Sequence, residues 1–220
     1  MITDQAATED DGTLVAIVDK LLVSNRLRIA CVISGRNSIC ADARKVEEPA
    51  LEAVRSLLVL AASQADVKAG LPAALKAAQD RIDGWETGQP SCLKAYFALW
   101  SERPDAWVIG STKGAFPGLT PYEVGLVEAV SQPPVDRSLW PERGHDLTRE
   151  VALRLIEQQR RTPAQWGAFN IGGAAELVRV DGFGIRRELI CRWPDRIGQK
   201  IDPRPWWKRL AHSLRPRHAS

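Results

Sequence analysis

Two apolar runs on either side of a short polar turn, within Gly12–Ser38, constrain the fold of this chain more than any other feature. Apolar residues alternate faces along Leu14–Val18 and again along Leu27–Ile33, and Asn25-Arg26 lies between the two runs. A two-residue period places successive side chains on opposite faces of a β-strand. Because both sets of alternate positions are apolar, the pattern predicts a β-hairpin that is buried on both faces.

The composition is that of a globular domain. The chain has 220 residues, 45% of them hydrophobic, so it can bury a substantial core, and one domain over 1–203 is the simplest organisation. The net charge of +3 is unevenly placed, with no base in residues 1–12 and no acid after Asp202. A nearly neutral body does not favour extended contacts with phosphates. We therefore expect no nucleic-acid partner except through the basic, tryptophan-containing tail at 204–220.

The cysteines and histidines form no recognisable site. The four cysteines include no Cys-x-x-Cys pair, which in a chain of this size favours reduced thiols, and Cys31 and Cys191 lie in apolar strand patterns that predict burial. The three histidines assemble neither a metal cluster nor a catalytic triad. No apolar run approaches the ~18 residues of a membrane span, and the acidic start lacks a signal-peptide pattern. We predict no cofactor, no metal, no membrane span and a cytoplasmic location.

The rest of the chain alternates hairpins with pairs of helices, as helical and two-residue periods, caps and turn residues indicate. The expected elements, in chain order, are helices over 49–63 and 71–82, a hairpin over 93–110, helices that begin at the capping box Thr120-Pro121-Tyr122-Glu123 and at Asp146, and a hairpin over 174–193 with its turn at Asp181-Gly182. Each helix pair must cover a face of the sheet that the neighbouring hairpins build. The predicted fold class is α+β, a four-layer αββα sandwich of two mostly antiparallel sheets with helices outside.

This order of elements, with Lys20 at the start of the segment DKLLVSNRLRIACVISGR, resembles the N-terminal nucleophile (Ntn) hydrolases. The likeness is to the proteasome β-subunit and its HslV-like relatives, and it extends to about Trp193. It implies that Lys20 lowers the pKa of an N-terminal amine, which serves as the general base for a threonine, serine or cysteine nucleophile. Because only nineteen residues precede Lys20, the first strand of the family and its nucleophile are expected to be missing.

Two functions follow from this resemblance. The first is a catalytically silent, proteasome-like protein that acts through self-association or a protein partner, because a missing strand leaves a sheet edge to be covered. The alternative is a self-processing threonine amidohydrolase or peptidase with a peptide or amide substrate. In that case cleavage at Gly12-Thr13, the residue pair at which proteasome-type precursors cleave themselves, exposes Thr13 as the nucleophile, and Lys20 tunes its amine. Asp11-Gly12 is also typical of a turn before a strand, and Lys20 of a solvated charge at a strand end.

Overall fold

The computed structural model describes residues 1–8, 11–35, 39–42, 45–84, 92–128, 130, 134–141, 147–163 and 167–204. The chain divides into two compact units. Unit 1 consists of the described residues of Met1, Lys20–Val130 and Val178–Arg187, and unit 2 of those of Ile2–Asp19, Ser131–Leu177 and Glu188–Ser220. The tail after residue 204 lies outside the described residues, so the domain boundary expected there stays a prediction.

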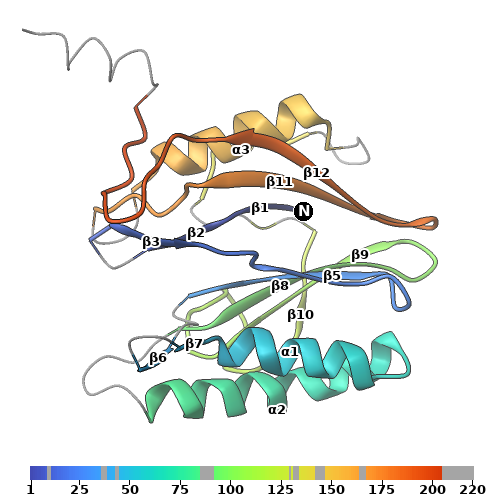
Figure 1. Ribbon diagram of the computed structural model, residues 1–220. Coiled ribbons are helices and arrows are strands. Elements are labelled where there is room, and N and C mark those ends of the chain that lie inside the picture. The colour runs from blue at the N-terminus through green and yellow to red at the C-terminus, as the bar shows by residue number, and fades with distance from the viewer. Residues whose placement is uncertain are drawn as a thin grey trace, which may run out of the picture. The chain divides into compact units, whose positions relative to one another are not determined.

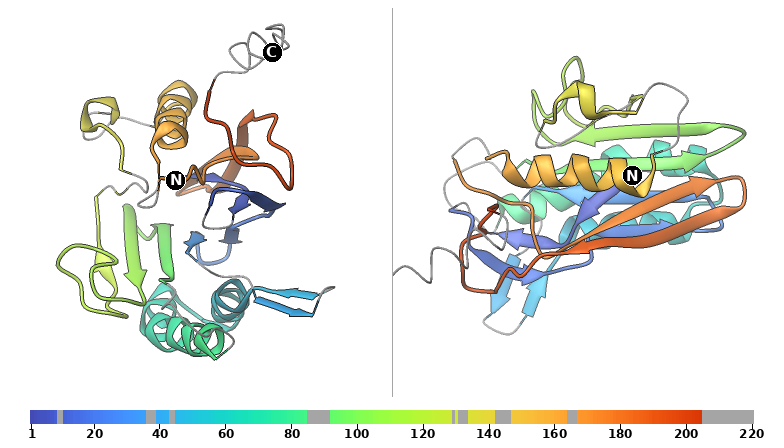
Figure 2. Two further views of the ribbon diagram at one scale, coloured as in Figure 1. Left: turned by 90° about the vertical axis from the view of Figure 1, so that its left-hand side faces the viewer. Right: turned by 90° about the horizontal axis from the view of Figure 1, so that it is seen from above.

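Unit 1 is built on a five-stranded antiparallel sheet with the strand order β10-β9-β8-β5-β4 (Figure 1). These strands are β4 (Leu21–Ser24), β5 (Ile29–Ser34), β8 (Lys94–Trp100), β9 (Pro104–Gly110) and β10 (Gly125–Leu126). Helices α1 (Pro49–Leu60) and α2 (Gln64–Asp83) lie side by side along one face of this sheet, as Figure 2 shows from two further directions. The short ribbon of β6 (Ile39–Asp42) and β7 (Lys45–Glu47) precedes α1.

Strand β5 is buried on both faces, as its alternating apolar residues predict. Ile29, Cys31 and Ile33 pack into the core that α1 and α2 cover. Ala30 and Val32 face the opposite way and join a second cluster, which includes residues of the hairpin formed by β11 (Ala174–Asp181) and β12 (Gly184–Arg192). Complete burial raises the pKa of the Cys31 thiol, so this cysteine serves as a small hydrophobic residue of the core.

The partner predicted for the first apolar run is wrong. Strand β3 (Leu14–Ile17) pairs antiparallel with β2 (Ala6–Thr8), whereas the strand that pairs with β5 is β4. The polar pair Asp19-Lys20 interrupts the apolar alternation after Val18, and the chain resumes a strand only at β4. The hairpin with its turn at Asn25-Arg26 therefore begins at Leu21 rather than at Leu14.

The helix predicted after Thr120 is also absent from the described residues, although its capping contacts form. Glu123 accepts hydrogen bonds from the Thr120 amide at 3.0 Å and from the Thr120 hydroxyl at 2.8 Å. Tyr122, however, has a φ of 64°, and its amide donates to the Gly110 carbonyl at 2.7 Å. The left-handed backbone at Tyr122 prevents a right-handed helix from starting there. The segment instead turns toward β9 and pairs with it as β10.

The other predicted helices form: α1 starts at Pro49 as predicted, whereas the starts of α2 and α3 are shifted. Helix α2 begins at the capping box of Ser63 and Asp66, earlier than the predicted start at Leu71. Helix α3 (Arg149–Arg161) begins after Thr148, whose hydroxyl accepts the Val151 amide at 3.3 Å. The cap predicted at Asp146 lies outside the described residues.

The sheet of unit 2 begins with a strand close to the start of the chain. Strand β1 (Ile2–Asp4) pairs antiparallel with β11, and the sheet order is β1-β11-β12. Ala152 and Ile156 of α3 pack against apolar residues of β11 and β12, so this helix covers the sheet within unit 2 (Figure 1). The hairpin predicted over Ala174–Trp193 is present as β11 and β12.

A buried ion pair ties α3 to the C-terminal segment of unit 2. Arg160 donates to both carboxylate oxygens of Asp195, at 2.7 and 2.8 Å, and each of the two side chains is only 2% exposed. Arg160 also donates to the carbonyls of Ile171 at 2.6 Å and Asp202 at 2.9 Å, and it lies over the Trp193 ring. These bonds satisfy a charge that would otherwise be costly to bury.

The Arg160→Met substitution is expected to lower the free energy of unfolding by about 3–5 kcal/mol, because it leaves the Asp195 carboxylate buried without its cation. The matched control is Arg161→Met, since Arg161 is exposed and pairs with Glu157 one helical turn away. That control should change stability by less than about 0.5 kcal/mol. Urea unfolding of both variants measures the difference, and equal midpoints would contradict a stabilising role for the buried pair.

Candidate functional site

Thr13 lies where a paired strand begins. Gly12 before it has a φ of 84°, the left-handed conformation that glycine adopts readily. The Gly12 carbonyl accepts the Ile201 amide at 3.0 Å, and Thr13 forms an antiparallel bridge with Lys200. The peptide bond between Gly12 and Thr13 is therefore held within backbone pairing to the C-terminal segment of unit 2.

Asp11 is the acid that contacts Thr13. Hydrogen bonds from the Thr13 side chain and from its amide, the latter at 2.9 Å, lower the pKa of Asp11 to about 2, with a further contribution from the Lys200 ammonium group at 3.1 Å. A carboxylate with so low a pKa is a weak general base. Asp11 is thus poorly suited to take the hydroxyl proton of Thr13 during attack on the Gly12 carbonyl, and the contacts fit a turn that opens a strand.

Strands β1 and β2, which precede Gly12, are integrated into unit 2. Thr3 and Asp4 are each 6% exposed, and Ala6 is 2% exposed. The Asp4 carboxylate accepts the amides of Ala6 at 3.0 Å and Gly172 at 3.2 Å. Strands β1 and β2 therefore supply both core residues and hydrogen-bond partners to the rest of the unit.

Lys20, the second residue of the predicted catalytic pair, directly precedes β4 and is half-buried. It belongs to unit 1, whereas Thr13 belongs to unit 2. The catalytic role of these two residues stays a prediction.

Met1 is anchored to β11 within unit 1. Its amino group donates to the Val178 carbonyl at 2.8 Å, and its carbonyl accepts the Val178 amide at the same distance. Burial, and to a smaller degree the charge of Arg179, lowers the pKa of this amine to about 6. The neutral amine therefore predominates at pH 7, which permits its burial beside the hairpin.

A shallow groove lies between β4 and α1. Its volume is about 530 Å³, and it is lined by five apolar residues, one serine and two arginines: Leu21, Leu22, Val23, Leu58, Val59, Ser24, Arg26 and Arg55. β4 is the last strand in the order of its sheet, so the groove follows a sheet edge. Val59 is 70% exposed and its neighbour Leu60 is 81% exposed, so the end of α1 presents apolar surface beside the groove. This site is not predictable from the sequence, because each of its apolar residues has the spacing of an ordinary strand or helix residue.

Arg26 holds the turn after β4 against the end of α1. Its guanidinium donates to the Ala61 carbonyl at 2.5 Å and to the carbonyls of Leu58, Val59 and Ala62 at 3.3–3.4 Å. Helix α1 has no basic residue in its own last turn, so Arg26 supplies the positive charge that a helix C-terminus favours. The two walls of the groove are thereby fixed relative to each other.

Replacement of Arg26 by alanine is expected to lower the free energy of unfolding by about 1–3 kcal/mol, because the last carbonyls of α1 lose charge-assisted hydrogen bonds. Arg103→Ala, at an exposed turn between β8 and β9, is the control and should leave stability within about 0.5 kcal/mol of the original chain. Chemical denaturation followed by circular dichroism provides the measurement. If the two variants unfold at the same midpoint, Arg26 does not stabilise α1.

In the part of the chain that the structure describes, no group of three or more His, Cys, Asp and Glu side chains is arranged to hold a metal ion. Among the helices of the described part of the chain, none is long and apolar enough to cross a membrane.

Comparison with known proteins shows the fold. No protein-family model matches the chain, and no curated protein matches its sequence. Among solved structures, the chain is similar to a mutant, Anbu (Gly-1), from Hyphomicrobium sp. strain MC1, with a TM-score of 0.50 and 14% identity over 96% of this chain and 86% of that one. Anbu is a proteasome-like protein with an Ntn-type fold. The predicted fold class, α+β of the Ntn-hydrolase-like αββα type, is confirmed, and the fold of this chain is proteasome-like.

This comparison contradicts the family that the sequence predicts. The sequence predicts a shortened member of the Ntn hydrolases close to the proteasome β-subunit and HslV, but no family model matches the chain. The reason is that an order of helices and strands is a property of a fold, which chains without detectable sequence similarity can share. The likeness that remains is one of fold.

Proposed function

We propose that this proteasome-like fold belongs to a non-catalytic protein that acts by self-association. The observation that carries the proposal is the incorporation of Ile2–Asp4 and Ala6–Thr8 into paired strands of the unit that contains Thr13. Self-processing at Gly12-Thr13 requires the removal of these same residues.

The loss of residues 1–12 would be costly for unit 2. It would remove β1 from the side of β11 and β2 from the side of β3. It would also leave the Gly172 amide without the Asp4 carboxylate, and an unpaired buried polar group costs about 1–3 kcal/mol. The folded state therefore favours the intact chain.

The surface that supports association is the groove between β4 and α1 with the apolar residues beside it. An exposed sheet edge with adjacent apolar side chains is typical of surfaces that bind another polypeptide. The proposal includes a cytoplasmic location, because Cys31, Cys92 and Cys191 are free thiols, as expected in a reducing compartment.

The alternative function is a self-processing threonine amidohydrolase or peptidase, with Thr13 as nucleophile and Lys20 lowering the pKa of the Thr13 amine. The sequence feature that supports this alternative is the pair Gly12-Thr13. The left-handed Gly12 and the hydrogen bond from the Thr13 side chain to Asp11 are also those of a turn that opens a strand. The mass of the purified chain separates the two functions.

Intact-mass spectrometry of freshly purified protein is expected to show residues 1–12 retained in every molecule, and Thr13→Ala should give the same pattern with only the substitution mass. Sedimentation velocity at increasing concentration should show association of the intact chain. A product that begins at Thr13 in the original chain and is absent in Thr13→Ala would establish self-processing instead. A monomer at all concentrations up to the millimolar range would refute self-association.

A further inference from the structure

Three hairpin turns meet at one end of unit 1, where they join β4 to β5, β8 to β9 and β11 to β12 (Figure 1). The Trp100 amide, at the second turn, donates to the Arg28 carbonyl of the first at 3.1 Å. Gly182 of the third turn lies against the Trp100 indole, where an added Cβ would come within 3.4 Å of the ring nitrogen. These contacts bring together three segments that are far apart in the sequence. The turn surface consists of residues 25–28, 100–105 and 181–187.

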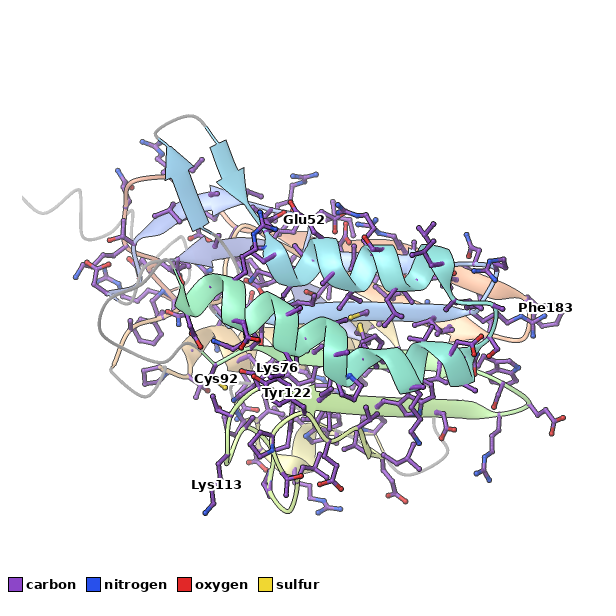
Figure 3. The ribbon with its side chains drawn as sticks, turned by 90° about the horizontal axis from the view of Figure 1, so that it is seen from below. Glu52, Lys76, Cys92, Lys113, Tyr122 and Phe183 are labelled. Carbon is purple, nitrogen blue, oxygen red and sulfur yellow. The ribbon has the colours of Figure 1, made fainter. Side chains whose placement is uncertain are left out.

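The turn surface presents aromatic side chains. Phe183 is 101% exposed and projects from the tip of the β11–β12 hairpin (Figure 3), and Trp100 beside this tip is half-buried. The Asp181 carboxylate accepts the Phe183 amide at 2.8 Å, so the ring is carried by a hydrogen-bonded turn. A phenylalanine ring that contacts only water forgoes the burial of about 150–250 Å² that such side chains supply in cores and interfaces. Both faces of the Phe183 ring are thus open to a ligand.

The cations of the turn surface are all arginines, and they outnumber its acids. The charged residues are Arg26, Arg28, Arg103, Arg186 and Arg187, with Glu102, Asp105 and Asp181. Arg26 donates to the last carbonyls of α1, and Arg186 pairs with Asp181, whereas Arg28 and Arg103 are exposed. Arginine binds phosphate oxygens with two parallel hydrogen bonds and also stacks on flat rings. The charge of this surface therefore complements an anionic partner that contains rings.

Arg28 occupies a position that favours glycine. Its φ is 51°, and among the described non-glycine residues only Arg28 and Tyr122 have a positive φ. The Arg28 amide donates to the Asn25 carbonyl at 3.2 Å, so the residue closes the β4–β5 turn. A left-handed backbone is costly for a residue with a Cβ, and residues held in this way cluster at functional sites. A glycine would serve the turn better, so the fold itself does not explain the arginine.

On these grounds we propose that the turn surface binds single-stranded nucleic acid, with an unpaired base stacked on Phe183 and phosphates paired with Arg28 and Arg103. Stacking of bases on aromatic rings, combined with cationic contacts to the backbone, is the usual way in which proteins bind single strands without reading their sequence. The nearly neutral composition does not predict this ligand, because folding alone brings the arginines of the three turns together. The inference is independent of the self-association proposed above.

Other anionic partners fit this surface less well. A membrane surface is bound stably only through several apolar contacts or a lipid anchor, whereas Phe183 is flanked by glycines and the neighbouring turns carry the polar residues Asn25, Ser101 and Glu102. A nucleic-acid duplex keeps its base faces stacked, and separating them for an inserted ring has a cost. An unpaired strand offers free base faces and phosphates together.

Fluorescence anisotropy of full-length protein with labelled oligothymidylate and oligouridylate tests the proposal for DNA and RNA. Phe183→Ala should raise the dissociation constant by roughly fivefold to hundredfold, the effect of removing one stacked base. Lys113→Ala is the matched control, because Lys113 is exposed and follows β9 at the end opposite to the turn surface (Figure 3). This control should change the dissociation constant by less than about twofold, since only a distant charge is removed.

Arg28→Gly separates binding from folding. Glycine adopts the left-handed conformation without strain, so the midpoint of unfolding should stay the same or rise. The affinity for the oligonucleotides should fall, and the salt dependence of log Kd should become weaker by about 0.7, as expected when one phosphate contact with a single strand is lost. A variant that folds at least as well as the original chain cannot lose binding through unfolding.

Three outcomes would overturn the proposal. The first is equal affinity of the original chain, Phe183→Ala and Arg28→Gly, which would assign binding to another part of the chain, such as the basic tail at 204–220. The second is the absence of binding to either oligonucleotide at about 50 mM salt, where such contacts are strongest. The third is Phe183-dependent binding to vesicles that contain phosphatidylserine, without binding to the oligonucleotides. Sedimentation velocity tests self-association separately, so each proposal can fail without the other.

Discussion

The burial of β5 on both faces is the constraint on which the rest of unit 1 depends. A strand with apolar side chains in both directions is stable only when each face of its sheet is covered. Helices α1 and α2 cover the face of Ile29, Cys31 and Ile33, and the distal part of the β11–β12 hairpin covers the face of Ala30 and Val32. The position of that hairpin, and with it the exposed Phe183, follows from the need to cover the second face.

The packing of the N-terminal strands bears on whether this fold cleaves its own chain. Strands β1 and β2 carry buried side chains and pair with other strands, so the segment before Thr13 is structural. In a protein that generates its nucleophile by self-cleavage, the preceding segment is dispensable to the folded product. Here the Asp4 carboxylate bonds two backbone amides, and Gly12 and Thr13 are paired to residues 200 and 201. Because these contacts hold Gly12 and Thr13 in backbone pairing, the proposed role is binding rather than hydrolysis.

Local signals were reliable where the elements that they predict also pack well. The apolar stripe after Pro49 forms α1, and the alternating residues of β8, β9, β11 and β12 form hairpins at the predicted places. The helix predicted from the capping box at Thr120 does not form, because pairing of the segment with β9 outweighs the preference of four residues for a helix start. The partner of β3 was wrong because a two-residue period identifies a strand and its faces but carries no information about which strand lies beside it.

The sequence by itself determined the α+β class, the burial of β5, and the turn at Gly12 before Thr13, because these depend on residue periodicity and on conformational preferences over a few neighbours. Only the tertiary structure decided the rest. It placed β1 against β11 and Arg26 at the end of α1, and in both cases the residues concerned are more than 30 positions apart. Contacts over such separations arise from the joint packing of both faces of a sheet, which no local pattern records.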